Sequence, residues 1–133
     1  MKRHGLSGGV VALACAFGVT GAAFAQEQAS RRIHTHAAVG QTVRLSGHVN
    51  YRPCGTVIPT TIIVVRAPTH GTLTVRDEMV TSAAPELGHD DKCRGHSGQG
   101  KAVYYARTSS GADVFKYESS SANGVVHFAV TVD

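Results

Sequence analysis

Residues 112–132 read ADVFKYESSSANGVVHFAVTV, and this stretch decides the fold class. Ala112–Glu118 and Val125–Val132 both place bulky apolar or aromatic residues at every second position. Side chains of a β-strand point alternately to its two faces, so this period of two predicts two half-buried strands. Asn123 and Gly124 both tolerate a positive φ and predict a tight turn between the strands. The stretch therefore indicates an all-β domain.

Earlier parts of the chain contain more segments of this kind, rich in Val, Ile, Thr and Tyr. Thr42–Val49 alternates clearly, and we expect its even-numbered residues, which include Ser46 and His48, on the solvent-exposed face. Thr60–Arg66 is almost continuously apolar, which is typical of a central strand. Further strands are expected over Ile33–Val39, Thr72–Arg76 and Lys101–Arg107. Six or seven strands at this spacing favour a single Greek-key β-sandwich.

Three connections separate these strands. Tyr51–Pro59 carries two prolines, which cannot donate a backbone hydrogen bond, and predicts an irregular connection. Ala67–Gly71 contains Pro68 and a glycine able to take a positive φ, and predicts a turn that joins its flanking strands in a hairpin. Asp77–Gly100 is polar and predicts a long loop; loops of this length are usually functional or disordered.

Several motifs resemble the bacterial Ig-like and cadherin-like repeats, whose pattern is roughly P-x-H-G-T-L, a tyrosine strand, G-x-D-x-F-x-Y, a glycine turn and a valine-rich strand. The matching residues are Pro68–Leu73, Tyr105, Gly111–Tyr117, Asn123–Gly124 and Val126–Val132. The resemblance implies an Ig-like fold in which Phe115 lies in the core and Asp113 braces the preceding turn. It also implies that Tyr117 lies near a sandwich corner and bonds to the main chain.

The chain departs from that repeat in three places. Tyr105-Ala106-Arg107 stands where the repeat has Tyr-x-Pro, and neither the Cys54/Cys93 pair nor the histidine-bearing loop belongs to the common pattern. Such repeats normally occur in tandem inside long surface proteins. A lone copy therefore indicates a different use.

The N-terminus has the features of a secretory signal. Lys2 and Arg3 precede an apolar stretch over Val10–Val19, and Ala23-Phe24-Ala25 fits the small-x-small cleavage rule. We therefore expect a signal peptide over 1–25, a flexible leader over 26–32 and a β-sandwich domain over 33–133, in a periplasmic or secreted protein. The apolar stretch is too short for a transmembrane segment. Leu13-Ala14-Cys15 also loosely resembles a lipoprotein box, so acylation at Cys15 is an alternative.

Cleavage would leave two cysteines, Cys54 and Cys93. An even count in an oxidising compartment predicts a disulfide between them. Closing a loop of this length stabilises a domain by on the order of 3 to 4 kcal/mol in the chain-entropy model.

The charge of the chain argues against nucleic-acid binding. The net charge of +4 falls to +2 when Lys2 and Arg3 leave with the signal, and the remaining Lys and Arg residues are scattered. Tryptophan is absent and other aromatic residues are few, so the cationic stripe with stacking rings that nucleic-acid binders use is missing.

Histidine is the side chain most suggestive of chemistry, because seven would remain after cleavage. His34 and His36 are two residues apart and would project from one face of a strand. In the long loop, a group of polar residues surrounds Cys93 and forms our expected binding loop: His89, Asp90, Asp91, Arg94 and His96. A copper or zinc site would use His34, His36, His89 and His96. Tight metal-binding spacings such as H-E-x-x-H are absent, which favours a protein without a cofactor.

Catalysis has little support in the sequence. Gly95-His96-Ser97-Gly98 partly resembles a nucleophile elbow, but its second glycine falls one residue early. We therefore expect a non-catalytic exported Ig-like module, a binding or structural accessory protein of the cell envelope. It would present Asp77–Gly100 to another protein or an envelope polymer. The alternative is a periplasmic His-rich copper- or zinc-binding protein.

Overall fold

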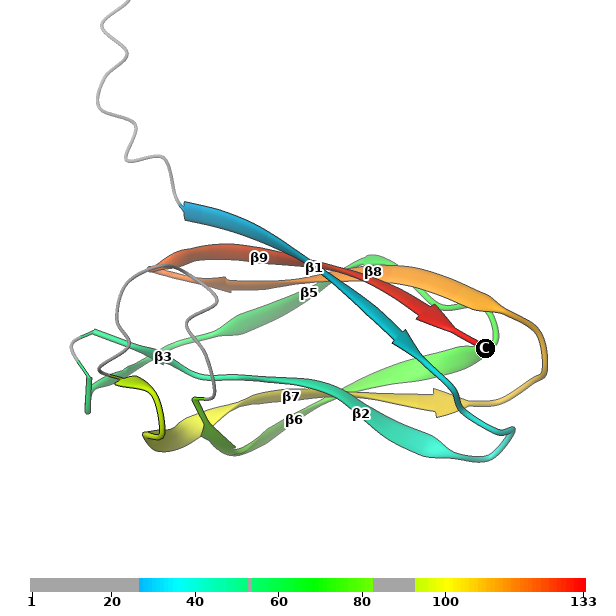
Figure 1. Ribbon diagram of the computed structural model, residues 1–133, viewed down its shortest axis with the longest axis horizontal. Helices are drawn as coiled ribbons and strands as arrows, with labels where there is room; N and C mark the ends of the chain where they lie inside the picture. The colour runs from blue at the N-terminus through cyan, green and yellow to red at the C-terminus, as the bar shows by residue number, and fades with distance from the viewer. Residues whose placement is uncertain (1–26, 53, 83–92) are drawn as a thin grey trace, which may run out of the picture.

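The structure of the protein is a computed structural model that describes residues 27–52, 54–82 and 93–133. Two sheets lie face to face (Figure 1). The four-stranded sheet contains, in spatial order, β1 (Glu27–Thr35), β9 (Gly124–Val132), β8 (Asp113–Ser121) and β5 (Thr61–Arg66). The three-stranded sheet contains β2 (Thr42–His48), β7 (Ser97–Arg107) and β6 (Gly71–Thr81). A small hairpin pairs β3 (Asn50–Tyr51) with β4 (Val57–Ile58). The predicted all-β class is confirmed.

The sandwich has two ends, where the connections between strands lie, and two sides, where the edge strands of both sheets lie. Connections 36–41, 67–70 and 108–112 lie at one end with Asp133, and we call this the Asp113 end. The β3–β4 hairpin, residues 93–96 and the turn at 122–123 lie at the other, which we call the disulfide end. The edge strands β1 and β2 flank one side of the sandwich, and the edge strands β5 and β6 flank the opposite side.

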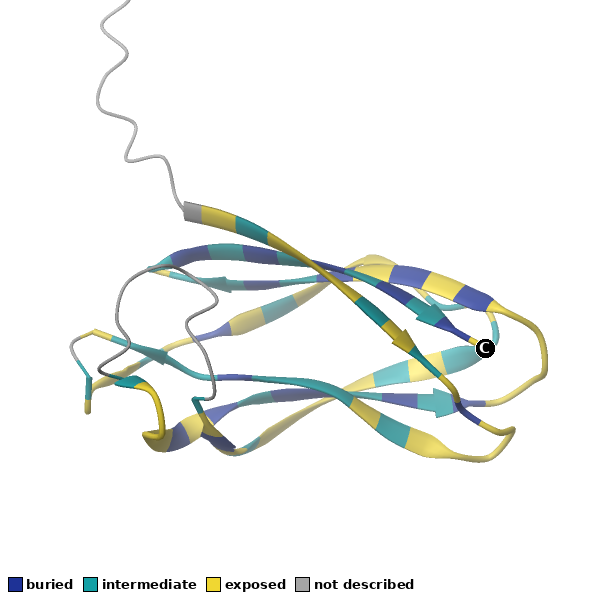
Figure 2. Ribbon diagram, in the orientation of Figure 1, coloured by how far each residue is buried: buried dark blue, intermediate teal, exposed yellow. Residues whose placement is uncertain are grey.

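Alternating burial along β7, β8 and β9 builds the core between the sheets (Figure 2). Tyr105 and Phe115 are fully buried, and their rings stack with centroids 5.3 Å apart. Tyr117 stacks on Phe128 with centroids 4.9 Å apart. The predicted alternation of the C-terminal strands is confirmed, as is the core position of Phe115. The Asn123–Gly124 turn joins β8 to β9 with Gly124 at φ 138°.

The prediction that the even-numbered residues of Thr42–Val49 face solvent is wrong for the second half of the strand. A β-bulge between Arg44 and Ser46 shifts the register of β2 against β7. A bulge inserts one residue and exchanges the faces that follow it. His48 is therefore buried, with 3% of its surface exposed, and its Nε2 lies 2.7 Å from Ser46 Oγ. Ser46 Oγ in turn contacts the hydroxyl of Tyr117, the residue expected near a sandwich corner.

The strand expected at the centre of a sheet lies at an edge. β5 pairs with β8 and ends the order of the four-stranded sheet, and three of its apolar residues are exposed: Ile63, Val64 and Val65. The hairpin expected around Ala67–Gly71 is also wrong, because β5 and β6 belong to different sheets. Gly71 does not adopt a positive φ; a Cβ there would overlap the ring of Tyr105.

The long loop expected over Asp77–Gly100 is much shorter. β6 and β7 pair over eleven residues each, which places 77–81 and 97–100 in the ladder. The glycines that predicted a loop, Gly98 and Gly100, lie in β7 instead, where they allow neighbouring segments to pack closely. A Cβ on Gly100 would overlap the carbonyl of His48, and one on Gly98 would lie 2.6 Å from Val57 Cγ2.

Two further expectations are corrected by backbone pairing. From Glu27 onward, the leader expected over 26–32 belongs to β1, which pairs in parallel with β9 and ends at Thr35. The connection expected over Tyr51–Pro59 contains the short β3–β4 ladder. Pro59 lies just beyond β4 and so takes no donor from this ladder. Pro53 lies outside the described residues.

Candidate functional site

A disulfide fastens the two hairpins at the disulfide end. Cys54, in the turn of the β3–β4 hairpin, is bonded to Cys93, which lies shortly before β7, and their Cα atoms are 5.2 Å apart. The predicted disulfide is therefore confirmed. Backbone hydrogen bonds continue the β6–β7 hairpin beyond its ladder: Ser82 donates to the carbonyl of His96, and Gly95 donates to that of Ser82. Both hairpins are thus held to each other at this end.

Side-chain amides fix the direction of the β3–β4 hairpin. Asn50 Nδ2 donates to Thr60 Oγ1 at 2.8 Å across the base of the hairpin. Asn123 Nδ2, from the turn between β8 and β9, donates to the carbonyl of Tyr51 at 3.1 Å. The hairpin is therefore tied to both its own base and the four-stranded sheet.

A groove of about 400 Å³ lies between this hairpin and the β6–β7 ladder. One wall consists of β4 with Pro59 and Thr60, and the other consists of Asp77, Gln99, Gly100 and Lys101. Pro59 and Thr60 lead directly into β5, so the groove lies at the disulfide end of the β5/β6 side.

The two walls of the groove differ in chemistry. Val57 on β4 is 40% exposed and supplies an apolar surface. Opposite it, Lys101 Nζ forms an ion pair with Asp77 Oδ1, and both side chains remain accessible to solvent. An exposed pair of this kind contributes little to stability, about 1 kcal/mol or less. The groove can therefore hold an extended apolar segment. Lys101 and Asp77 can leave each other and bind polar groups of that segment with little loss of stability.

The expected binding loop is only partly described. Arg94 and His96 are exposed on either side of Gly95, next to the disulfide. The ring of His96 lies edge-on to Tyr51, with centroids 6.3 Å apart. His89, Asp90 and Asp91 lie outside the described residues.

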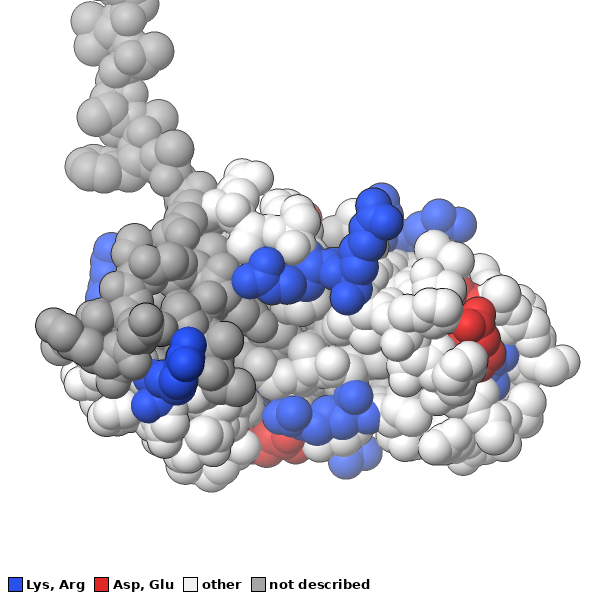
Figure 3. Space-filling view, viewed as in Figure 1, with Lys and Arg blue, Asp and Glu red and all other residues white. Residues whose placement is uncertain are grey.

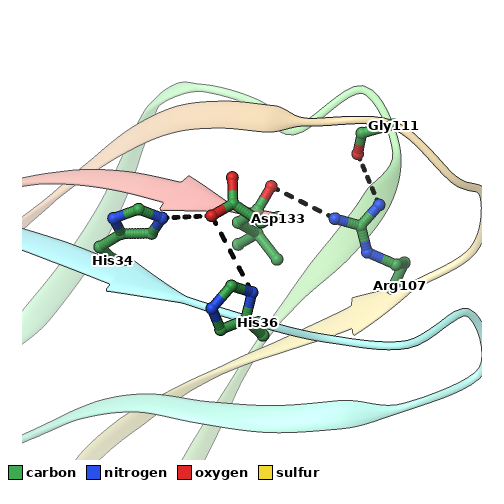
Figure 4. Close-up of polar contacts among 6 residues, drawn as sticks. His34, His36, Arg107, Gly111 and Asp133 are labelled. Atoms are coloured by element: carbon green, nitrogen blue, oxygen red, sulfur yellow. Dashed lines mark hydrogen bonds and ion pairs between the residues drawn. The ribbon is translucent and has the colours of Figure 1, made fainter.

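Of the histidines of the expected metal site, the described ones lie at opposite ends of the sandwich, His34 and His36 at one end and His96 at the other. His34 and His36 lie at the Asp113 end, where His34 Nε2 contacts Asp133 Oδ2 and His36 Nδ1 lies 3.9 Å from it (Figure 4). His34 is opposite Thr131 on β9, whereas His96 is near the other end of that strand. At about 3.3 Å per residue, the two histidines are roughly 25 Å apart.

The contact between His34 and Asp133 has an electrostatic effect. The hydrogen bond from His34 lowers the pKa of the Asp133 carboxyl below its ordinary value, and the charges of the nearby histidines and of Arg107 act in the same direction. Within the described residues, no group of three His, Cys, Asp or Glu side chains is arranged to hold a metal ion.

No pattern in the sequence predicts the residues of the groove. Lys101 stands at the start of an expected strand and Asp77 at the start of the expected loop, and their spacing does not mark them as a pair. One signal was present: Lys101 shares the alternation of Val103 and Tyr105, both of which are buried. A lysine at a core-facing strand position needs a partner or an opening to solvent.

Comparison with protein families, with characterised proteins and with solved structures finds no match to this chain. The described ranges contain no helix with the length and hydropathy of a membrane span.

Proposed function

We propose that this chain is an exported, Ig-like binding module of the cell envelope, without a catalytic role, and that it holds its partner in the groove beside the disulfide. The partner is another protein or an envelope polymer that offers an extended, partly apolar segment. The observation that carries this proposal is the groove itself, which has one apolar wall and one charged wall and lies between two hairpins that a disulfide joins.

The strand order supports the Ig-like, Greek-key part of the proposal. β2, β7 and β6 form one sheet and β1, β9, β8 and β5 the other, so the chain crosses between the sheets after β1, after β2 by way of the β3–β4 hairpin, after β5 and after β7. Two stacked antiparallel sheets with such crossings are typical of Ig-like sandwiches. The parallel β1–β9 pair adds an edge strand to this arrangement.

Export is supported by the disulfide and by the signal features of residues 1–25. Disulfides persist in oxidising compartments and are rare in the cytosol. The Cys54–Cys93 bond joins two segments 39 residues apart and fastens together the two hairpins that form the walls of the groove, so the proposed site depends on that compartment.

Recognition by a rigid sandwich is usually carried by surfaces near its loops. The groove fits this rule, since the β3–β4 hairpin that forms its apolar wall belongs to the connection between β2 and β5. The Lys101–Asp77 pair gives the charged wall both a donor and an acceptor for a polar partner group.

A pair of charge-introducing variants tests the groove. Val57→Asp places a carboxylate on the apolar wall, and Val39→Asp places one on the 36–41 connection at the opposite end, where Val39 is 59% exposed. The tagged protein, exported to the periplasm, is crosslinked in cells, and the captured proteins and glycans are quantified. We expect Val57→Asp to reduce capture of the partner about tenfold, which corresponds to about 1.4 kcal/mol. Val39→Asp should leave it unchanged. Equal capture by both variants, each with an unchanged melting temperature, would rule out the groove.

A further inference from the structure

The edge strand β5 carries an apolar surface that its own fold leaves uncovered. Within the described residues β5 pairs with β8 alone, so the hydrogen-bonding groups on its other edge face outward from the sheet. Ile63, Val64 and Val65 are 46%, 45% and 56% exposed. Such an edge is a template for pairing with another strand.

The uncovered apolar surface of β5 includes a side chain that points between the two sheets, Val64. Val64 lies opposite Tyr117 in the ladder, and Tyr117 is fully buried, so both side chains point toward the core. Val64 nevertheless remains 45% exposed. β5 and β6 are the last strands of their sheets on this side, and within the described residues no further strand closes the opening between them. On the same side, Val75 and Met79 of β6 are 41% and 57% exposed and extend the apolar surface.

The other edge strands are protected by charge, and β5 is not. β1 carries Arg31 and Arg32, β2 carries Arg44, and Figure 3 shows Lys and Arg side chains gathered over the β1/β2 side. β6 carries three consecutive charged residues, Arg76–Glu78. Charged side chains are the usual means by which edge strands avoid association. In β5 the only charge is Arg66 at its last position.

The position of Arg66 suits pairing of β5 with a copy of itself. In an antiparallel pair centred near Ile63, residues at the start of one β5 lie opposite residues at the end of the other. The two Arg66 side chains would then lie at opposite ends, roughly 20 Å apart at the usual rise per residue. This exceeds the screening length of about 8 Å at physiological salt. The apolar centres would meet each other.

We propose that two copies of this chain associate through β5, in antiparallel register about a two-fold axis near Ile63, so that two four-stranded sheets become one continuous sheet of eight strands. The bulge between Val64 and Arg66 restricts the regular ladder to Thr61–Val64, which lies nearest the axis. The interface covers Val64 and Ile63 and satisfies the outer backbone groups of β5. It goes beyond the proposed groove function, because the groove is formed within one chain.

Sedimentation velocity on the exported protein, from about 1 to 500 µM, tests the association in the range expected for a small interface. The decisive variant is Ile63→Lys. In the single chain the new lysine lies across from Glu118, which is favourable for the sheet. In the dimer two such lysines face each other near the axis, and like charges placed directly opposite destabilise a strand pair.

We expect the wild-type protein to dimerise and Ile63→Lys to weaken association at least tenfold without lowering the melting temperature. The matched control, Val39→Lys, removes a similarly exposed apolar side chain far from β5 and should dimerise normally. Amide exchange supplies a second measurement: amides of β5 should become protected as concentration rises, and those of β6 should change little.

Three outcomes would overturn the proposal. A protein that stays monomeric throughout the concentration range has no such interface. A dimer that Val39→Lys disrupts and Ile63→Lys does not must form elsewhere. Concentration-independent protection of β5 in a monomer would mean that another part of the same chain covers the edge. None of these results bears on the groove, which the Val57→Asp experiment tests separately.

Discussion

The two ends of the sandwich are held by different means. The Asp113 end is held by buried polar groups that bond to several connections at once, whereas the disulfide end is held by one covalent bond beside an open groove. A polar cluster of this kind needs deep burial and a complete set of partners. A disulfide needs neither, so it can hold an end whose surface stays accessible for binding.

Asp113 is the centre of the polar end. Its carboxylate is fully buried and accepts hydrogen bonds from the backbone amides of Thr69 and His70, both at 2.9 Å, and from the hydroxyl of Tyr105 at 2.8 Å. The turn that it braces, at 67–70, is remote in the sequence from the turn before β8 that the family resemblance implied. Asp113, on β8, thus joins the 67–70 connection and Tyr105 of β7 to the four-stranded sheet.

Arg107 completes this end from the last position of β7. Its Nη1 donates to the carbonyl of Gly111 at 2.5 Å (Figure 4) and to that of Ser109 at 3.0 Å. Its Nη2 donates to the carbonyl of Val132 at 3.2 Å. Arg107 is 4% exposed. Hydrogen bonds to a charged donor contribute more than neutral ones, about 1.5 to 3 kcal/mol each.

The largest expected effect comes from removing the disulfide. The Cys54→Ala/Cys93→Ala double variant should lose about 4 kcal/mol of unfolding free energy, because the unfolded chain regains the entropy of a long closed loop. Urea denaturation measures the loss. Amide exchange should rise in β3, β4 and the adjoining ends of β6 and β7, and stay low around Asp113. Uniform exchange throughout the domain would show that the two ends are not independent.

Asp113→Asn should have the next largest effect, a loss of about 2 to 3 kcal/mol. The amide cannot accept from all three donors, and buried donors without an acceptor cost about 1 to 3 kcal/mol. Here exchange should rise at 67–70 and at the start of β8, with the disulfide end unchanged. A loss below about 0.5 kcal/mol would show that this end does not depend on the carboxylate.

Acid titration sharpens the same test. Burial raises the pKa of Asp113, but hydrogen bonds from Thr69, Tyr105 and His70 outweigh it and hold the pKa below its ordinary value. The folded pKa is therefore below the unfolded one, so the stabilisation is complete above the unfolded value of about 4 and is lost as pH falls through the folded pKa. The stability difference between wild type and Asp113→Asn should shrink below pH 4. A pH-independent difference would contradict the assignment.

Tyr105→Phe should have the smallest effect, a loss of about 1 kcal/mol, because it removes one hydrogen bond to Asp113 and keeps the buried ring. Burial, followed by the hydrogen bond to Asp113, raises the pKa of Tyr105 to about 12. Tyr104→Phe is the matched control: it removes a hydroxyl that bonds to Glu78 on the outer face of the three-stranded sheet. Equal losses in the two variants would show that depth of burial is unimportant.

Which residues form strands could be predicted from the sequence better than where each strand lies in its sheet. Alternation in β7, β8 and β9 is regular, and the core followed from it. The predicted solvent-exposed face of β2 is wrong after Arg44, because the period of two does not reveal the bulge there. An apolar run such as Thr61–Arg66 is equally compatible with a central strand and with an exposed edge, so composition alone could not place β5.

The candidate site could be predicted only in outline. Cys54 and Cys93 located the end of the molecule that carries it, since only two cysteines remained to pair. The groove depends on Val57 and Lys101 approaching from strands far apart in the sequence, and no local pattern encodes that approach. Gly98 and Gly100 were the available clue, because a glycine in a strand often marks close passage of another chain segment.

The parallel pairing of β1 with β9 has a mechanical consequence. The two strands pair over nine residues, from Glu27 with Gly124 to Thr35 with Val132. β1 begins at the disulfide end, and β9 finishes at the Asp113 end. Tension applied to Glu27 and Asp133 in opposite directions would therefore pull along both strands and load their hydrogen bonds together in shear, and not peel them apart one by one.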